Sequence, residues 1–231
     1  MDINIKSLLH RRNYVKDFLY LALMLTLPIL DITYKMLNNP SVKVHSLMTD
    51  IDRSIPFVNA FIVPYVIWYG FIYAVLVYLY FKDKEIYLKT LLTYEVCILI
   101  SFIIYALFQT TVPRPVLSGN DFLTNIVRWV YQSDNPFNCF PSTHSFSSYV
   151  IFKGVSESKI KNKIIRFVIS SMCILVMIST IFVKQHVILD LLGAIILGEV
   201  VCKIVFKFKW EKINDMSEGK ASTSISDSHI L

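Results

Sequence analysis

The stretch of residues 57–81 contains no charged residue, and the nearest charges on its two sides are Arg53 and Lys82. A helix needs about 20 mostly apolar residues to cross a bilayer. Apolar blocks of this kind recur along the chain, which is 55% hydrophobic and 17% charged, whereas a typical soluble domain has about 25% charged residues. The pattern excludes a disordered chain, a collagen-like fibre and an ordinary soluble enzyme, and it indicates a membrane protein.

The cysteines exclude a further class, the disulfide-rich secreted scaffold. The chain has four cysteines in 231 residues, which is too few for such a framework. Cys97, Cys173 and Cys202 lie inside apolar blocks, so only Cys139 falls in an expected loop, where it has no second cysteine to pair with.

Six apolar segments are candidates for membrane-spanning helices. Five have the required length, namely residues 18–37, 57–81, 91–110, 164–183 and 187–206. The sixth, residues 143–154, is short and opens with polar residues, but a span here keeps the topology of its neighbours consistent. We therefore predict an all-α fold, a transmembrane bundle of six helices over residues 1–210, followed by a disordered cytoplasmic tail over residues 211–231.

The distribution of Lys and Arg sets the expected orientation. With the N-terminus in the cytoplasm, 17 of the 23 Lys and Arg residues fall on the cytoplasmic side, as the positive-inside rule requires. No small-residue cleavage site follows the first apolar block, so we interpret it as a retained span. We predict a multi-pass plasma-membrane protein with both termini in the cytoplasm. Its net charge of +6 meets anionic lipid headgroups rather than nucleic acid, and the sequence leaves its oligomeric state open.

Three polar clusters interrupt the apolar pattern, and the predicted topology places all three at the outer face of the membrane. They are residues 111–115 around Arg114, residues 138–145 with Ser142, Thr143 and His144, and Lys184-Gln185-His186 followed by Asp190. The helices that carry these clusters begin or end on the same side of the membrane. The clusters can therefore form one pocket without the chain crossing the bilayer between them.

Each cluster also has a structural interpretation. Arg114 lies between two prolines, which fits a rigid turn with a solvated side chain. Ser142 or Thr143 fits a helix N-cap. His186 and Asp190, four residues apart on one expected helix face, fit a buried histidine that a carboxylate satisfies. Ionisable groups at membrane depth are costly, however, and function is their default interpretation.

Taken together, the three clusters suit phosphoryl transfer. Asp190 can orient His186 for nucleophilic attack, and His144 can donate a proton to a leaving group. Arg114 offers a fork of N–H donors that fits a phosphate. Ser142 adds a hydroxyl at a helix start, where free N–H groups attract anions. The predicted substrate group is therefore a phosphate that is attacked at phosphorus.

At these residues the sequence resembles the type 2 phosphatidic acid phosphatase (PAP2) superfamily of membrane lipid phosphatases, which has three motifs. Arg114-Pro115 matches the end of the first motif, whose lysine falls here on Leu107. Residues 141–144, Pro-Ser-Thr-His, match the second motif, with Thr143 in place of glycine.

The third motif matches at Ser179-Thr180, with His186 and Asp190 at the motif's spacing and Thr180 in place of arginine. Two cations that bind phosphate in the family are therefore missing. Lys184, two residues before the candidate nucleophile, is a possible substitute, although a Lys at a helix end more often reaches to the membrane surface.

The resemblance implies a role for each matched residue. His186 would be the nucleophile that forms a phosphohistidine, Asp190 would orient it, and His144 would be the general acid. The residues that would bind the phosphate are Arg114, Ser142, Thr143 and Lys184. The resemblance implies no metal and no other cofactor. It makes the chain a phosphoric monoester hydrolase of the PAP2 type, acting on phosphatidic acid, a diphosphate or another lipid phosphate.

Two other functions stay open. A lipid phosphotransferase, similar to inositol phosphorylceramide synthase or sphingomyelin synthase, would pass the phosphoryl group or phospho-headgroup to an acceptor alcohol instead of water. A non-catalytic lipid-binding or transport protein would keep the fold without the chemistry. Residues 121–132 have apolar side chains at helical spacing. They predict a loop helix, either packed on its neighbours or lying in the membrane interface near the pocket mouth.

Overall fold

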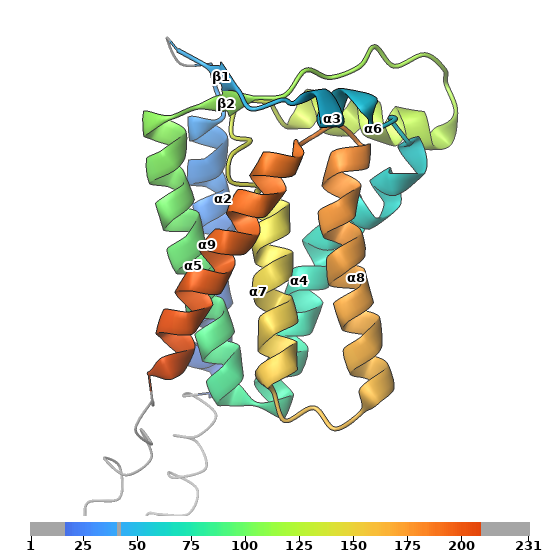
Figure 1. Cartoon of the computed structure of the whole chain (residues 1–231). Helices are drawn as coiled ribbons and strands as arrows, with labels where there is room; N and C mark the ends of the chain where they lie inside the picture. Colours follow the sequence, from blue (N-terminus) through green and yellow to red (C-terminus); the bar gives the residue numbers. More distant parts are fainter. Residues whose placement is uncertain (1–16, 41–42, 209–231) are drawn as a thin grey trace, which may run out of the picture.

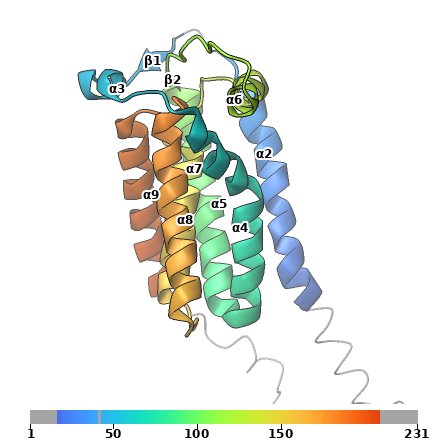
Figure 2. The ribbon, with the colours of Figure 1, turned by 90° about the vertical axis from the view of Figure 1, so that its right-hand side faces the viewer.

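The protein is a bundle of long helices capped at one end by short elements (Figures 1 and 2). The computed structural model describes residues 17–40 and 43–208. In chain order the elements are η1 (Leu23–Leu25), α2 (Thr26–Leu37), β1 (His45–Ser46), α3 (Asp50–Ser54), η2 (Asn59–Phe61), α4 (Ile62–Lys82), α5 (Lys84–Leu107), β2 (Thr110–Thr111), α6 (Phe122–Ser133), α7 (Thr143–Glu157), α8 (Lys163–Phe182) and α9 (Ile188–Lys207). The two short strands pair in parallel, and the predicted helical fold is confirmed.

Four of the described segments are long and apolar enough to cross a membrane: Asp17–Leu37, Asn59–Lys82, Lys84–Leu107 and Lys163–Phe182. The remaining two predicted spans correspond to α7 and α9. Helix α7 has only 15 residues, and α9 contains three charged residues before its last turn (Asp190, Glu199 and Lys203). The described residues thus show a membrane protein with four such helices. The predicted tail, residues 211–231, lies outside the described residues.

Helix α7 is the centre of the bundle, since α4, α5, α8 and α9 all pack against it (Figure 1). This position explains why its sequence looks so little like a span. Its Ser145, Ser147 and Ser148 are buried, so they face other helices and not lipid. Small residues let the neighbours approach closely: a Cβ at Gly154 would collide with the side chain of Thr90 on α5.

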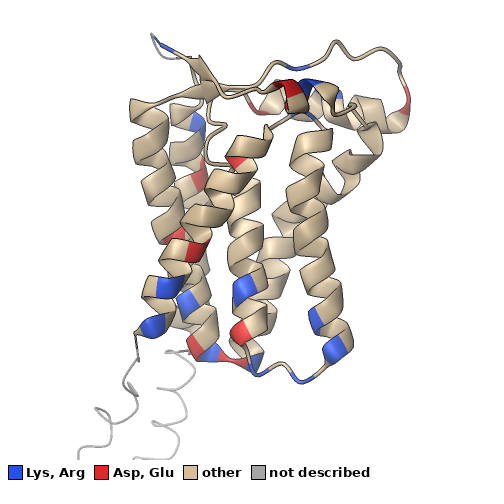
Figure 3. Cartoon of the chain, in the orientation of Figure 1, with Lys and Arg blue, Asp and Glu red and all other residues tan. Residues whose placement is uncertain are grey.

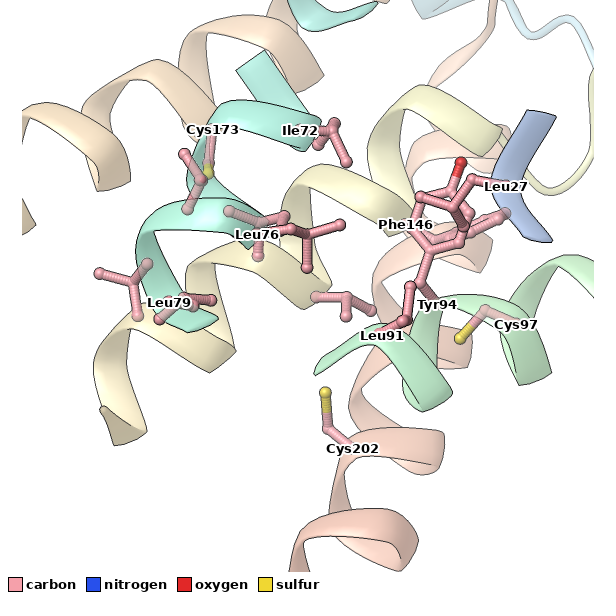
Figure 4. Packing of buried hydrophobic residues seen from close by; sticks show 14 of the residues in the cluster. Leu27, Ile72, Leu76, Leu79, Leu91, Tyr94, Cys97, Phe146, Cys173 and Cys202 are labelled. Atoms are coloured by element: carbon pink, nitrogen blue, oxygen red, sulfur yellow. The ribbon is translucent and has the colours of Figure 1, made fainter. Parts of the chain in front are cut away.

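Apolar side chains from the long helices interlock in the middle of the bundle, as Figure 4 shows. The labelled ones are Leu27 of α2, Ile72, Leu76 and Leu79 of α4, Leu91, Tyr94 and Cys97 of α5, Phe146 of α7, Cys173 of α8 and Cys202 of α9. All four cysteines are free and buried. Cys139 does lie in the loop predicted for it, but only 3% of it is exposed, because it packs with Val112 and Val187.

Helices α3 and α6 and the strand pair lie together across one end of the bundle (Figure 1). Helix α6 occupies almost the predicted residues and begins at Phe122, after the N-cap residue Asp121, whose carboxylate accepts a hydrogen bond from the N–H of Thr124. The prediction that residues 121–132 are helical is therefore confirmed. A small apolar cluster that includes Tyr65, Val127 and Val183 holds α6 against α4 and the end of α8.

The predicted limits of the span at residues 91–110 are wrong. Helix α5 begins at Lys84, because the carboxylate of Asp83 caps its first turn by accepting from the N–H of Ile86. It ends at Leu107, just before β2. Figure 3 shows that Lys and Arg gather at the opposite end of the bundle from α3 and α6, around the end of α9 and the α4–α5 and α7–α8 connections.

Candidate active site

Helix α7 begins at the loop that carries the second polar cluster. Ser142 is its N-cap: its hydroxyl accepts hydrogen bonds from the N–H of Ser145 (3.4 Å) and from the Ser145 hydroxyl (3.0 Å). The N–H of Ser142 donates to the backbone oxygen of Asp190 at 3.3 Å. The N-cap prediction for Ser142 is confirmed, and this bond ties the start of α7 to the start of α9.

His186 and Asp190 form a pair in the turn between α8 and α9. His186 Nδ1 lies 3.3 Å from Asp190 Oδ2, which also accepts from the N–H of Val187 at 3.0 Å. The expectation of a shared helix face is wrong, because α9 begins only at Ile188. The pair forms because Asp190, in the first turn, reaches back across the helix start. Nε2 of His186 is the ring nitrogen that Asp190 does not contact.

His144 lies across from this pair, at the second position of α7. The centroids of the two imidazole rings are 6.5 Å apart. The His144 ring stacks on Tyr65 (4.2 Å between centroids) and packs against Trp68 (4.0 Å), both from α4. Its Nε2 is buried and has no hydrogen-bond partner among the described residues. The structure therefore brings the two predicted histidines and the carboxylate into one place.

Arg114 joins the same region through the loop before α6. Its guanidinium donates to the backbone oxygens of Tyr131 (2.8 Å) and Asp134 (2.7 Å) and to Oε1 of Gln185 (2.6 Å). It also lies over the Tyr131 ring, 4.5 Å from the centroid. Gln185 directly precedes His186, so Arg114 is fixed next to the His186 turn. Its Nε–H has no acceptor in the described part of the chain.

Lys184 is placed differently. Its ammonium donates to the backbone oxygens of Asp52 (2.9 Å) and Ile55 (2.6 Å), and burial lowers its pKa. The carboxylate of Asp52 in turn accepts from the N–H of Ile188 at 2.8 Å. Lys184 thus helps to hold the α3 segment against the α8–α9 turn.

Thr143, the other residue of the second cluster predicted to bind phosphate, lies at the first position of α7. Its hydroxyl is 3.1 Å from the hydroxyl of Tyr105.

Buried polar atoms without a hydrogen-bond partner gather around these residues. A buried polar group left without a partner costs about 1–3 kcal/mol. In residues 17–40 and 43–208 the atoms concerned are Arg114 Nε, Asn138 Oδ1, His144 Nε2, Ser148 Oγ, Gln185 Nε2 and Asp190 Oδ1. All belong to the start of α7 or α9, or to the loops beside them. This concentration fits a site that is completed by a polar ligand.

A cavity of about 260 Å³ reaches His144 from the space between α2, α4, α5 and α6. The residues that line it are Leu27, Asp31, Tyr34, Lys35, Trp68, Tyr69, Tyr94, Ile98, Trp129, Val130, Ser133, Asp134, Thr143 and His144. Most of these side chains are apolar or aromatic. The cavity therefore offers a mainly apolar space directly beside His144.

The comparisons with known proteins agree with this geometry. The sequence model of one family, described as the PAP2 superfamily, matches residues 86–214, more than half of the chain. The chain belongs to the PAP2 superfamily. No curated protein and no solved structure matches it. The matched region includes the positions that resemble the three PAP2 motifs, and with them Arg114, His144, His186 and Asp190.

The two positions where PAP2 motifs carry a cation have other uses here. Leu107 is 82% exposed at the end of α5. Thr180 is buried, and its backbone oxygen accepts from the N–H groups of Gln185 (3.0 Å) and His186 (3.1 Å). The backbone of Thr180, rather than a cationic side chain, thus shapes the turn that presents the PAP2 histidine.

Cys139, His186 and Asp190 are also the described residues that come closest to a metal site, since each offers a ligand atom within 4.8 Å of the others. The three groups are buried. A metal there would occupy the nitrogen and oxygen atoms that pair His186 with Asp190. His186 and Asp190 would therefore act without a metal under the PAP2 motif pattern and as metal ligands in this grouping. Removing metal ions with a chelator distinguishes the two possibilities.

Trp68, Asp134 and Gln185 belong to the site, although the sequence motifs do not single them out as functional. Gln185 adjoins His186, so its place in a polar cluster was a usable signal. Trp68 looks like an ordinary span residue and Asp134 like a loop residue. Only the long-range packing of α4 against α7, and of α6 against α4, brings them to the cavity.

Proposed function

We propose that this PAP2 superfamily protein is a membrane lipid phosphatase that hydrolyses a lipid phosphate monoester through a phosphohistidine. The carrying observation is that His186, paired with Asp190, lies across from His144, whose Nε2 is buried and unpartnered within the described residues. This arrangement supplies an oriented nucleophile and a separate acid. Membership of the superfamily supports phosphoryl chemistry on lipid phosphates.

In the first step, Nε2 of His186 attacks phosphorus. An N–P bond forms, the bond from phosphorus to the lipid oxygen breaks, and His144 gives its proton to that oxygen. The lipid leaves as a neutral alcohol. Asp190 holds the proton on Nδ1 of His186, which keeps Nε2 free for attack and stabilises the cation that forms.

In the second step, water attacks the phosphohistidine. His144, now neutral, takes a proton from the water as its oxygen bonds to phosphorus. The N–P bond breaks, its electron pair returns to His186, and inorganic phosphate leaves. Arg114 Nε–H, the Ser142 and Thr143 hydroxyls and the first N–H groups of α7 would stabilise the phosphate oxygens in both steps.

The position of the cavity and the distribution of Lys and Arg support a reaction at the outer face of the membrane. We propose six spans, with α7 and α9 completing the bundle, because neighbouring helices bury the serines in the first turns of α7 and Asp190 of α9. The basic end of the bundle would face the cytoplasm, together with both termini. The site would then open at the outer face of the plasma membrane, where a lipid phosphate can reach the cavity.

A phosphate-release assay tests the proposal. Purified protein in detergent is given phosphatidic acid, a diacylglycerol diphosphate and a polyprenyl phosphate, with and without EDTA. We expect release from at least one lipid that is insensitive to EDTA and absent in His186→Ala. Loss of activity with EDTA, restored by a divalent metal, would contradict the metal-free mechanism and favour the grouping of Cys139, His186 and Asp190.

The missing cations at Leu107 and Thr180 favour a second candidate, a lipid phosphotransferase. With fewer cations the site fits a singly charged phosphodiester better than a dianionic monoester. His186 would then carry the phospho-headgroup, with the first lipid leaving as an alcohol, and would pass that group to an acceptor alcohol. This candidate predicts a new lipid product when diacylglycerol or ceramide is added with a phosphodiester donor. Free phosphate from a monoester, with no transfer product from the diester, would favour hydrolysis.

A further inference from the structure

The cavity beside His144 is unusual for a phosphate site, because it is lined by two carboxylates and only one Lys or Arg. Five aromatic residues line it (Tyr34, Trp68, Tyr69, Tyr94 and Trp129), together with the carboxylates of Asp31 and Asp134. Its one cationic side chain among the lining residues, Lys35, is paired with Asp31 at 3.0 Å. Among the described residues Asp134 is in no ion pair, so its carboxyl group is the acidic group of this aromatic cavity that remains available to a cationic ligand.

Asp134 connects this cavity to the phosphate site. Its backbone oxygen accepts from Arg114, and its Oδ1 accepts from Asn38 Nδ2 (2.6 Å) and from the Tyr34 hydroxyl (3.3 Å). No donor among the described residues reaches Oδ2. The carboxylate is thus fixed in position, with one oxygen left for a ligand in the cavity.

The charges around the histidines favour a substrate that brings its own cation. Arg114 donates to the backbone oxygen of Asp134, and Asp190 pairs with His186. A phosphate bound between Arg114 and the histidines would therefore lie near both acidic residues, while Lys184 binds backbone oxygens. A bare phosphate next to Asp134 would be repelled. An ammonium group between the phosphate and Asp134 would be attracted by both, and would remove that repulsion.

We propose that the cavity is a subsite for an ammonium group carried by the lipid substrate close to its phosphate. Aromatic faces bind ammonium through cation–π attraction, and a carboxylate adds a direct ion pair. Trp68 lies between the two parts of the site, since it packs on His144 and also lines the cavity that would hold the ammonium. The proposal rests on the proposed function and specifies its substrate.

The ammonium has two possible sources. It can lie on the headgroup, as in phosphoethanolamine and phosphocholine diesters, which are the donors of the phosphotransferase reaction. It can also lie on the lipid itself, as in a sphingoid-base phosphate, a monoester that suits the phosphatase reaction. The recognition chemistry is the same in both cases, and the substrates used in the assay separate them.

Matched substrate pairs test the subsite. One arm compares a sphingoid-base phosphate with its N-acylated form, in which an amide replaces the ammonium. The other compares a phosphocholine lipid with its dimethylbutyl analogue, in which carbon replaces the nitrogen. We expect kcat/KM to favour the ammonium member of at least one pair by about tenfold or more, and Asp134→Asn to remove most of that preference.

Glu199→Gln is the matched control, because it also neutralises a carboxylate but lies away from the cavity; it should retain the preference. Binding is measured in parallel by quenching of tryptophan fluorescence, which needs no turnover, in wild type and in Trp129→Leu. Equal turnover and equal binding within both pairs would overturn the subsite. If binding favours ammonium but no lipid phosphate is turned over, the subsite stands and the proposed function fails.

Discussion

This helical bundle has two polar clusters, one partly exposed and one buried, and they differ in how completely their members are paired. Toward the basic end, the Glu199 carboxylate accepts from the Tyr149 hydroxyl at 2.6 Å and pairs with Lys153 (3.3 Å) and Lys203 (3.1 Å). At the other end, the cluster around His144 and His186 contains several buried atoms without partners among the described residues. A polar cluster whose hydrogen bonds are all made within the protein stabilises the fold, whereas a cluster with unpaired donors and acceptors can bind a ligand.

The largest expected effect comes from the incomplete cluster. His186→Ala removes the proposed nucleophile, so kcat/KM for phosphate release should fall at least about a thousandfold. The thermal midpoint should stay close to that of wild type, which is checked by differential scanning fluorimetry in detergent. Near-normal turnover in the folded variant would show that His186, like Glu199, is not required for the reaction.

His144→Ala should have the next largest effect. Loss of a general acid lowers turnover of lipid phosphates by about 100- to 10,000-fold. An aryl phosphate, whose leaving group needs no proton, should lose far less in the first step, and this difference is visible in the burst phase of rapid-mixing experiments. Equal losses for both substrates would remove the acid role from His144.

Glu199→Gln should lower the stability of the protein and leave its activity unchanged, the reverse of the histidine variants. Weakening its pairs with Lys153 and Lys203 removes a charge-assisted contact, and a loss of about 1 kcal/mol corresponds to a fall of roughly 2–4 °C in the thermal midpoint. Phosphate release per folded molecule should stay near that of wild type. A large loss of activity at unchanged stability would mean that the paired cluster also contributes to function.

The smallest effect concerns pH. Burial raises the pKa of the Asp134 carboxyl, with Arg114, His186 and Tyr34 lowering it in part and Asp31 adding to the rise. Asp134 therefore takes up a proton at higher pH than an ordinary carboxyl does. The preference for ammonium substrates should decrease as pH falls toward that pKa. The ratio of kcat/KM values within a substrate pair measures this, because pH effects on the steps that both members share cancel in the ratio.

Part of this structure could be predicted from sequence because the signals are local. Long apolar runs such as α8 indicate spans by themselves, and Ser142 is a recognisable N-cap. Helix α7 is the exception, because its polar residues become acceptable only once neighbouring helices enclose it. The pairing of His186 with Asp190 was predicted for the wrong reason, since the turn before α9, and not a helix face, brings them together.

The residues that shape the pocket were harder to predict, since they come from distant parts of the chain. Trp68 reaches His144 from α4, and Asp134 reaches the cavity from the end of α6. Lys184 illustrates the opposite difficulty: its sequence position suggested a phosphate contact, yet its ammonium donates to Asp52 and Ile55. Local patterns indicate which groups are available, and only tertiary packing decides which of them meet.

Direct detection of the phosphohistidine tests the central claim. Protein mixed with phosphate-labelled lipid is quenched in alkali, where phosphohistidine survives, and is then digested and analysed by mass spectrometry. We predict a phosphoryl group on His186 in the wild-type protein and in Glu199→Gln, and no label in His186→Ala. Turnover without any labelled histidine, or with the label on His144, would contradict the mechanism.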